Sequence, residues 1–273
     1  MKKNLLTLLI ILLSVIYGGN NLSAQNYKAQ VGNTKYATID EAITKWTNNT
    51  TLTLLADVTL SDVITLNSTE HHILDLSTYT MTAASKKNAI NIVNNGRKSA
   101  SYTLDIKADA NEPGGIDAPS YTIVKTTGKS GVQDRPIIRF YGGIFTASNI
   151  ISHSGSNGTN CPQFEFYGGE FNGKLSANRA KITFKGGTFN GNLSLSVDSS
   201  ANTLVMGGKF KYFSNSYGSG LNSGKFTVGS AKGVYDRGVY VDEDGYLVIG
   251  GDVIVGYKVN NEFNDKLSKY IDV

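Results

Sequence analysis

A short motif of aromatic residues and glycines recurs through the second half of the chain and constrains the fold more than any other feature. Phe-Tyr-Gly-Gly-Ile-Phe at 140–145 returns as Phe-Tyr-Gly-Gly-Glu-Phe at 166–171, Phe-Lys-Gly-Gly-Thr-Phe at 184–189 and Val-Met-Gly-Gly-Lys-Phe at 205–210. The second glycines of these copies stand at positions 143, 169, 187 and 208, and fainter copies follow at 223–226 and 248–253. Steps of about twenty residues are typical of a solenoid, in which each repeat packs on its neighbours.

The residue types within each copy predict a strand, a glycine corner and a second strand. Ile138 and Phe140 occupy alternate positions, which share one face of a strand. Phe145 follows Phe140 by five positions, so an unbroken strand would place the two rings on opposite faces. A glycine pair with positive φ, or a bulge, turns the chain and returns both rings to the interior.

We therefore expect an internal ladder of stacked rings from the second aromatic residue of each copy, with about 4.8 Å between strands. The members of this ladder are Phe145, Phe171, Phe189 and Phe210. Asn172-Gly173 and Asn190-Gly191 have the composition of tight turns and are expected to form the next corner of two repeats.

The two ends of the chain predict caps. Thr38 and Glu41 have the spacing of a helix capping box, and the apolar residues that follow predict a short helix over 39–47. Such a helix would shield the open edge of the first repeat from pairing with another chain. Short strands are expected at 52–55, 58–60, 63–66 and 73–76. At the other end, 242–245 predicts a hairpin turn, and a weak amphipathic helix carries Phe263, Leu267, Tyr270 and Ile271.

Together these features predict an all-β protein, a single-stranded right-handed parallel β-helix solenoid with a short N-terminal capping helix. The expected organisation is a signal peptide at 1–24, an N-terminal cap at 25–48, parallel β-helix coils at 49–230 and a C-terminal hairpin and capping segment at 231–273. Thirty glycines and four prolines suit many short strands joined by tight turns. Cys161 is the only cysteine, so no intramolecular disulfide can form, and a small buried apolar role is expected for it.

The segment 1–24 has the three parts of a secretory signal. Lys2 and Lys3 precede an apolar run over 5–17, and small residues lead to a predicted cleavage after Ala24. The run is shorter than the roughly 20 residues that span a bilayer, so no membrane span is expected after cleavage. We expect an exported protein that is secreted, periplasmic or on the cell surface. The net charge of +4 is too small to indicate nucleic acid as a partner.

Several segments resemble those of the parallel β-helix repeat proteins common among exported and surface proteins of bacteria. They are YATIDEAI at 36–43, LTLLADVTL at 52–60, LDL at 74–76 and the later Gly-Gly-x-Phe copies, covering about 36–252. The resemblance implies relatives that are mostly surface-exposed or adhesin-like, and a pectin-lyase-like architecture that also carries polysaccharide lyases and other polysaccharide enzymes. Fold alone does not decide between these functions.

The sequence yields no catalytic residue, no metal site and no cofactor site that we would predict. The densest acidic stretch matches no calcium-binding loop and predicts a solvated loop; its members are Asp105, Asp109, Glu112 and Asp117. His71-His72, in a turn-like segment, and the isolated His153 are expected to be polar surface residues. Asp75, within an apolar strand, is expected to make a structural hydrogen bond.

One surface feature is a candidate ligand-binding site. If Phe140 and Phe166 point inward, Tyr141 and Tyr167 point outward on neighbouring repeats, and Lys185 and Met206 continue the column. Two exposed rings at strand spacing could stack on sugars or on an apolar patch of a partner, although outward tyrosines also simply suit strands. We predict an exported non-catalytic binding or adhesion module for glycans or surface proteins. The alternative is a polysaccharide-active enzyme, a lyase or glycoside hydrolase, because a solenoid can bring distant carboxylates into one groove.

Overall fold

The computed structural model describes residues 26–67, 70–93, 103–127, 136–154, 162–178, 180–196, 202–205, 207–211, 225–226, 239–241 and 247–249. These residues are mostly β-structure, with one short helix, α2 (Ile39–Lys45). The strands are β1 (Ala29–Val31), β2 (Thr34–Tyr36), β3 (Thr50–Leu54), β4 (Val58–Thr59), β5 (Ile64–Asn67), β6 (His71–Asp75), β7 (Thr80–Thr82), β8 (Ile90–Val93), β9 (Thr103–Lys107), β10 (Gly115–Thr127), β11 (Ile137–Phe140), β12 (Ile144–Ser154), β13 (Gln163–Phe166), β14 (Glu170–Asn178), β15 (Lys181–Phe184), β16 (Thr188–Phe189), β17 (Leu193–Ser196), β18 (Asn202–Val205), β19 (Gly208–Phe210), β20 (Lys225–Phe226), β21 (Val239–Val241) and β22 (Leu247–Ile249).

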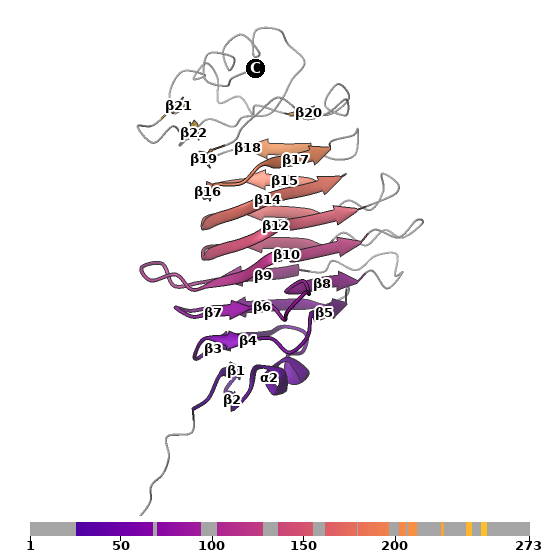
Figure 1. The fold of residues 1–273 in the computed structure, drawn as a ribbon, viewed down its shortest axis with the longest axis vertical. Coiled ribbons are helices and arrows are strands. Elements are labelled where there is room, and N and C mark those ends of the chain that lie inside the picture. The colour runs from indigo at the N-terminus through magenta and orange to yellow at the C-terminus, as the bar shows by residue number, and fades with distance from the viewer. Residues whose placement is uncertain are drawn as a thin grey trace, which may run out of the picture.

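Two sheets, parallel except at their ends, divide these strands between them. The ten-stranded sheet has the order β2-β1-β3-β6-β9-β11-β13-β15-β18-β20, and the main path of the twelve-stranded sheet is β21-β22-β19-β16-β14-β12-β10-β7-β4. Along the chain, each strand of the first sheet from β3 to β15 is followed by one long strand or two short strands of the second. Figure 1 shows the strands stacked along the long axis of the molecule. The strands expected at 52–76 are present and pair in parallel.

The long strands of the second sheet bend where their register shifts. The two short strands β7 and β8 pair with opposite ends of β10, and β16 and β17 do the same with β14. β10 pairs with β12 through a register shift between Ala118 and Thr122, and a comparable shift follows Thr146 in the pair of β12 with β14. The second sheet therefore consists of two segments, and its long strands bend at the register shift between them.

The predicted ladder of rings is confirmed. Phe145, Phe171, Phe189 and Phe210 are paired in register across β12, β14, β16 and β19, so the uneven repeat steps read from the motif are correct. Successive rings stack with centroids 5.1, 4.8 and 4.9 Å apart. All four are buried.

A second stack lies beside the first at right angles. Phe140, Phe166 and Phe184 of the ten-stranded sheet stack 5.0 and 5.3 Å apart. Their edges meet the first stack, as in the 85° contact of Phe140 with Phe145. Edge-to-face and offset-stacked pairs both suit the charge distribution of aromatic rings. From β11 to β19, the phenylalanines thus fill much of the space between the two sheets.

The glycine corners adopt the backbone conformation that the motif predicts. The second glycine of each copy has positive φ, from +104° at Gly187 to +125° at Gly208. At Gly143, with φ +115°, an added Cβ would lie 2.9 Å from the ring of Phe145. Glycine is required there both for the left-handed backbone and for the close approach of the ring.

The expected Asn-Gly corner is confirmed at Asn190 and Gly191, which separate β16 from β17, and is wrong at Asn172 and Gly173, which lie inside the extended strand β14. The asparagines also form a side-chain ladder: Asn190 Nδ2 donates to Asn172 Oδ1 at 2.6 Å, and both amides donate to Glu170 Oε1 at 3.1 Å. Gly173 is needed for another reason, since a Cβ there would lie 2.2 Å from the carbonyl oxygen of Ala147.

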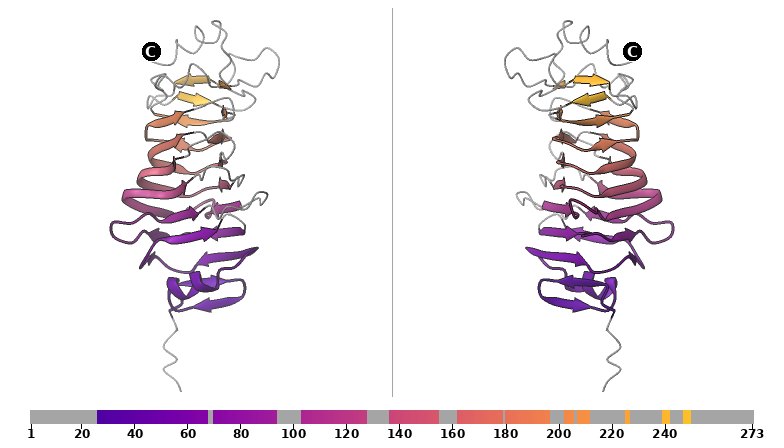
Figure 2. Two further views of the ribbon diagram at one scale, coloured as in Figure 1. Left: turned by 90° about the vertical axis from the view of Figure 1, so that its right-hand side faces the viewer. Right: turned by 90° about the vertical axis from the view of Figure 1, so that its left-hand side faces the viewer.

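The N-terminal cap contains more than the expected helix. Thr38 accepts a hydrogen bond from the Glu41 amide at the start of α2, as the capping box predicts, and Trp46 is the C-cap. A hairpin of β1 and β2 also pairs antiparallel with β3, so it extends the ten-stranded sheet beyond its first parallel strand. Figure 2 shows α2 at the same end of the stack. The helix and the hairpin together cap this end.

At the other end, β21 and β22 form the expected antiparallel hairpin and β22 pairs with β19. The faint copy at 223–226 was aligned wrongly: Phe226 pairs with Thr203 in the ten-stranded sheet, not with the ladder. The signal segment, Cys161, the turn at 242–245 and the helix predicted near Phe263 lie outside the described residues. Within the described part of the chain, no helix has the length and apolar character needed to cross a membrane.

Candidate functional site

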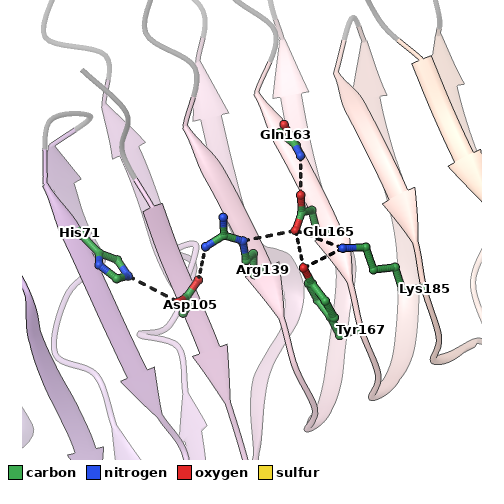
Figure 3. A network of polar contacts seen from close by, with 7 residues as sticks. All are labelled: His71, Asp105, Arg139, Gln163, Glu165, Tyr167 and Lys185. Atoms are coloured by element: carbon green, nitrogen blue, oxygen red, sulfur yellow. Dashed lines mark hydrogen bonds and ion pairs between the residues drawn. The ribbon is translucent and has the colours of Figure 1, made fainter. Parts of the chain in front are cut away.

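The outward face of the ten-stranded sheet carries a row of charged side chains. Asp105 on β9, Arg139 on β11 and Glu165 on β13 are direct register partners on three neighbouring strands. Arg139 lies between the two carboxylates: its Nη1 is 3.3 Å from Asp105 Oδ1 and its Nε is 3.2 Å from Glu165 Oε2 (Figure 3). One guanidinium therefore bridges two carboxylates that come from separate repeats of the chain.

Further polar groups extend this row on both sides. His71 Nε2 lies 3.4 Å from Asp105 Oδ2 at one end. At the other end, the Tyr167 hydroxyl donates to Glu165 Oε2 at 2.9 Å and accepts from Lys185 Nζ at 2.7 Å, while Gln163 Nε2 donates to Glu165 Oε1. Figure 3 shows these side chains reaching across successive strands of one sheet.

The carboxylates of this row are shielded from solvent and paired with positive charges. Asp105 is 7% exposed and Glu165 is 9% exposed. Burial alone would raise the pKa of Glu165, but the hydrogen bond from Tyr167 and the charges of Lys185 and Arg139 lower it below its ordinary value. Burial opposes the charge of Arg139, yet its two carboxylate neighbours raise its pKa overall. The row is a network of fixed charges.

A second row lies two positions further along the same strands and contains the predicted tyrosines. Tyr141 and Tyr167 are exposed, by 40% and 37%, and their rings stack with centroids 4.7 Å apart and planes inclined by 20°. Their predicted outward position is confirmed. The expectation for Lys185 is also confirmed, because it neighbours Tyr167; Met206 lies outside the described residues.

The lysines at the two ends of this second row cover the outer faces of the tyrosine pair. Lys107 Nζ lies 5.5 Å from the Tyr141 ring centroid, and Lys185 Nζ lies 4.1 Å from that of Tyr167. Each ring thus has one face against the other ring and one face toward a cation. We name this group the tyrosine–lysine row; it consists of Lys107, Tyr141, Tyr167 and Lys185. The row therefore presents ring edges, the Tyr141 hydroxyl and ammonium groups, and not the open ring faces that the sequence interpretation assumed.

Sequence reasoning misplaced part of the acidic stretch. Asp105 and Asp117 lie on strands β9 and β10 and not in a solvated loop. Asp109 is in the exposed loop, where its Oδ1 accepts from the amides of Asn111 and Glu112. A signal for Asp105 existed: Leu-Asp-Ile-Lys at 104–107 is a degenerate copy of Ile-Arg-Phe-Tyr at 138–141, and the two segments are paired in register.

The histidine predictions were wrong for His72 and His153, and right only in part for His71. His71 and His72 begin strand β6 and are not in a turn, but the side chain of His71 is 36% exposed, as expected of a surface residue. His72 is buried with its ring edge-on to Trp46, 4.9 Å between centroids, and burial lowers its pKa. His153 is buried too; its Nδ1 is 2.8 Å from Thr126 Oγ1, and burial lowers its pKa to about 4. The alternation of a short strand does not reveal such inward histidines, because histidine is intermediate between the residue types that are usually buried and those that are usually exposed.

Asp75 makes the expected structural hydrogen bond, since its Oδ1 accepts from the Ser77 amide at 2.9 Å. Among the residues whose placement is described, no three histidine, cysteine or acidic side chains gather as a metal site would require. No family model, curated protein or solved structure matches this chain.

Proposed function

We propose that this chain is an exported, non-catalytic binding or adhesion module for glycans or surface proteins, and that the tyrosine–lysine row is its contact surface. The observation that carries the proposal is the exposed Tyr141–Tyr167 pair, held in one place by cations on both sides. Aromatic groups with a polar tip are enriched in binding surfaces. The proposed scaffold is a right-handed parallel β-helix.

The scaffold proposal is supported by the strand order. Strands that alternate between two sheets, and pair in parallel with the strand of the preceding repeat, need one crossover per repeat. Crossovers between parallel strands are right-handed in about 98% of cases. Export is supported by the sequence of residues 1–24, whose cationic, apolar and small-residue parts suit a signal peptide.

The charged row beneath supports a preorganised surface. Glu165 accepts a hydrogen bond from the Tyr167 hydroxyl, and Lys185 donates one to that hydroxyl, so the phenol oxygen is already held in position before a ligand binds. Lys107, Lys185 and the Tyr141 hydroxyl then offer hydrogen-bond donors along a line across four strands. A linear ligand lying across the strands would meet all of them.

The enzyme alternative is favoured by one specific observation. Asp105 and Glu165 are two strands apart, or about 10 Å at the usual strand spacing, which is near the roughly 6.5–9.5 Å between the carboxyl groups of inverting glycosidases. Arg139, however, occupies the space between them, and a general acid needs a raised pKa whereas the pKa of Glu165 is lowered. The binding module is therefore the better proposal.

The test is a glycan array together with capture of surface proteins by the purified chain beginning at Gln25. We expect binding without turnover, lost in Tyr141→Ala/Tyr167→Ala. Tyr121→Ala is the matched control, because Tyr121 is 37% exposed on β10 of the other sheet. Circular dichroism verifies that each variant keeps its strands. Binding that survives the double substitution would reject this surface.

The same preparations decide the enzyme alternative. Pectins, host glycans and bacterial polysaccharides are incubated with the chain and analysed for new reducing ends and unsaturated products. Turnover that is abolished in Glu165→Gln or Asp105→Asn would replace the binding proposal with a catalytic one.

A further inference from the structure

We propose that Tyr141 and Tyr167 form an oxidative cross-linking site, at which a one-electron oxidant joins the two rings as dityrosine. This inference goes beyond the proposed function and does not depend on any ligand. It rests on the geometry of the ring pair, on a proton acceptor at one phenol and on the exposure of both rings to an outside reagent.

The ring pair is preorganised for coupling. The two residues follow adjacent, in-register strands, and the Tyr167 amide donates to the Phe140 carbonyl at 2.8 Å. The ring centroids are 4.7 Å apart. Dityrosine joins one ortho carbon of each ring, next to the carbon that bears the phenol oxygen. Rotation of the two exposed rings about their Cβ–Cγ bonds turns these carbons toward one another and leaves the phenol oxygens in place. Holding both reactants in place gives the intramolecular reaction a large advantage over collision between molecules.

The Tyr167 phenol has a proton acceptor in place. Its hydroxyl donates to Glu165 Oε2 at 2.9 Å. A phenol that loses an electron becomes a strong acid, so a hydrogen-bonded carboxylate can take its proton as the electron leaves. Glu165 is available as a base at neutral pH, because its pKa lies below the ordinary value. We expect Tyr167 to be the ring that is oxidised first.

The reaction balances with hydrogen peroxide and a haem peroxidase as the oxidant. Each phenol gives up one electron and one proton, and the two phenoxyl radicals form a carbon–carbon bond between ortho positions. Each bonded carbon then loses its hydrogen as a proton, each oxygen regains one, and both phenols are restored. The net loss is two hydrogen atoms from the protein. Hydrogen peroxide takes up the two electrons and two protons and becomes two water molecules.

The product would join successive repeats. Positions 141 and 167 belong to neighbouring copies of the motif, and the chain has a single cysteine with which no intramolecular disulfide can form. A covalent bond between neighbouring strands on an exposed face restricts the separation of those strands as a disulfide would. Tyr121 provides an internal comparison, since it is similarly exposed and, among the described residues, has no stacked ring.

The experiment treats the full chain with a haem peroxidase and hydrogen peroxide, and then maps cross-links by mass spectrometry. Trypsin leaves both tyrosines on the peptide 140–174, which has no internal lysine or arginine. Further cleavage after Glu165 and Glu170 separates them, unless dityrosine joins peptide 140–165 to peptide 166–170. We expect this joined product, less two hydrogen atoms, in the monomer and at a rate independent of protein concentration.

Matched variants decide the assignment. Tyr141→Phe and Tyr167→Phe keep a ring in the stack but cannot couple, so each should abolish the product, whereas Tyr121→Phe should leave it unchanged. Glu165→Gln should slow coupling by more than about tenfold if the carboxylate takes the proton. Because this variant loses the cleavage site after position 165, its coupling is followed as the loss of two hydrogen atoms from peptide 140–170. Cross-links that appear only between molecules, or that form equally at Tyr121, would overturn the proposal. So would an absence of product under conditions that couple free tyrosine, and an unchanged rate in folded Glu165→Gln would remove the carboxylate from the mechanism.

Discussion

Replacing Phe189 with alanine tests whether the ladder of rings stabilises the fold. The ring is buried and stacks on Phe171 and Phe210 at 4.8 and 4.9 Å, with edge contacts to Phe166 and Phe184 at 5.4 and 4.9 Å. A buried phenylalanine truncated to alanine costs about 3–5 kcal/mol, and each favourable ring pair contributes about 0.5–1.5 kcal/mol beyond its buried area. We expect a loss in the upper part of the range of about 3–5 kcal/mol, because the four neighbouring rings are held by their own stacks and cannot close the cavity.

The measurement is guanidinium unfolding followed by circular dichroism, with hydrogen exchange to locate the loss. Thr188→Ala is the adjacent control; Thr188 is half-buried, and its truncation should cost less than about 1 kcal/mol. Phe189→Leu should fall between the two, since it keeps an apolar group but removes the ring contacts. A loss in Phe189→Ala no larger than in Thr188→Ala would refute the reasoning. In Phe189→Ala, the rate of amide hydrogen exchange should increase most in β14, β16 and β19, since each repeat depends on its neighbours.

Three further predictions concern other parts of the molecule. The pKa of His153, lowered from 6.5 to about 4 in the folded chain, means that the unfolded chain binds more protons between these values. Stability should therefore fall by up to about 3 kcal/mol as the pH drops from 6.5 to 4, and His153→Leu should flatten this part of a pH–stability profile. Gly143→Ala should cost at least about 1–2 kcal/mol in chemical unfolding, whereas Gly142→Ala, with open space around its Cβ, should cost well under half of that. Mass spectrometry of the exported protein should find Gln25 at or near the amino terminus, and an intact leader would contradict the signal assignment.

The aromatic ladder could be predicted because its signal is local and periodic. Each copy contains its own alternation, and the five-position step from Phe166 to Phe171 already requires a glycine corner to bring both rings inside. The positive φ of Gly169 satisfies that requirement. The burial of such core side chains could therefore be predicted from residue type and spacing alone.

The charged row could not be predicted in the same way. Asp105 meets Arg139 only because β9 and β11 are paired in one particular register, and the stretch of chain between Arg139 and Glu165 has a different length. No fixed period connects these residues, and a single misplaced register would exchange inward and outward side chains. The β1–β2 hairpin was missed for a related reason: Ala29–Val31 and Thr34–Tyr36 are too short to show alternation, and their structure depends on pairing with β3.

The constant glycine corner has a consequence for what this architecture can accommodate. From Phe140 to Ile144 and from Phe166 to Glu170 the same short Tyr-Gly-Gly connection separates the two sheets, whereas the return from the second sheet is long between Ser154 and Gln163 but short between Asn178 and Lys181. In the repeats that contain the Gly-Gly motif, the first connection thus keeps one length while the second varies without disturbing the strand register; before these repeats the first connection is longer, as between Lys107 and Gly115. Loop closure costs only about 0.6 kcal/mol for each doubling of length. Within the Gly-Gly repeats, foreign peptide segments should therefore be accepted at the second connection and rejected at the first, which makes this part of the fold a scaffold with one edge open to sequence change.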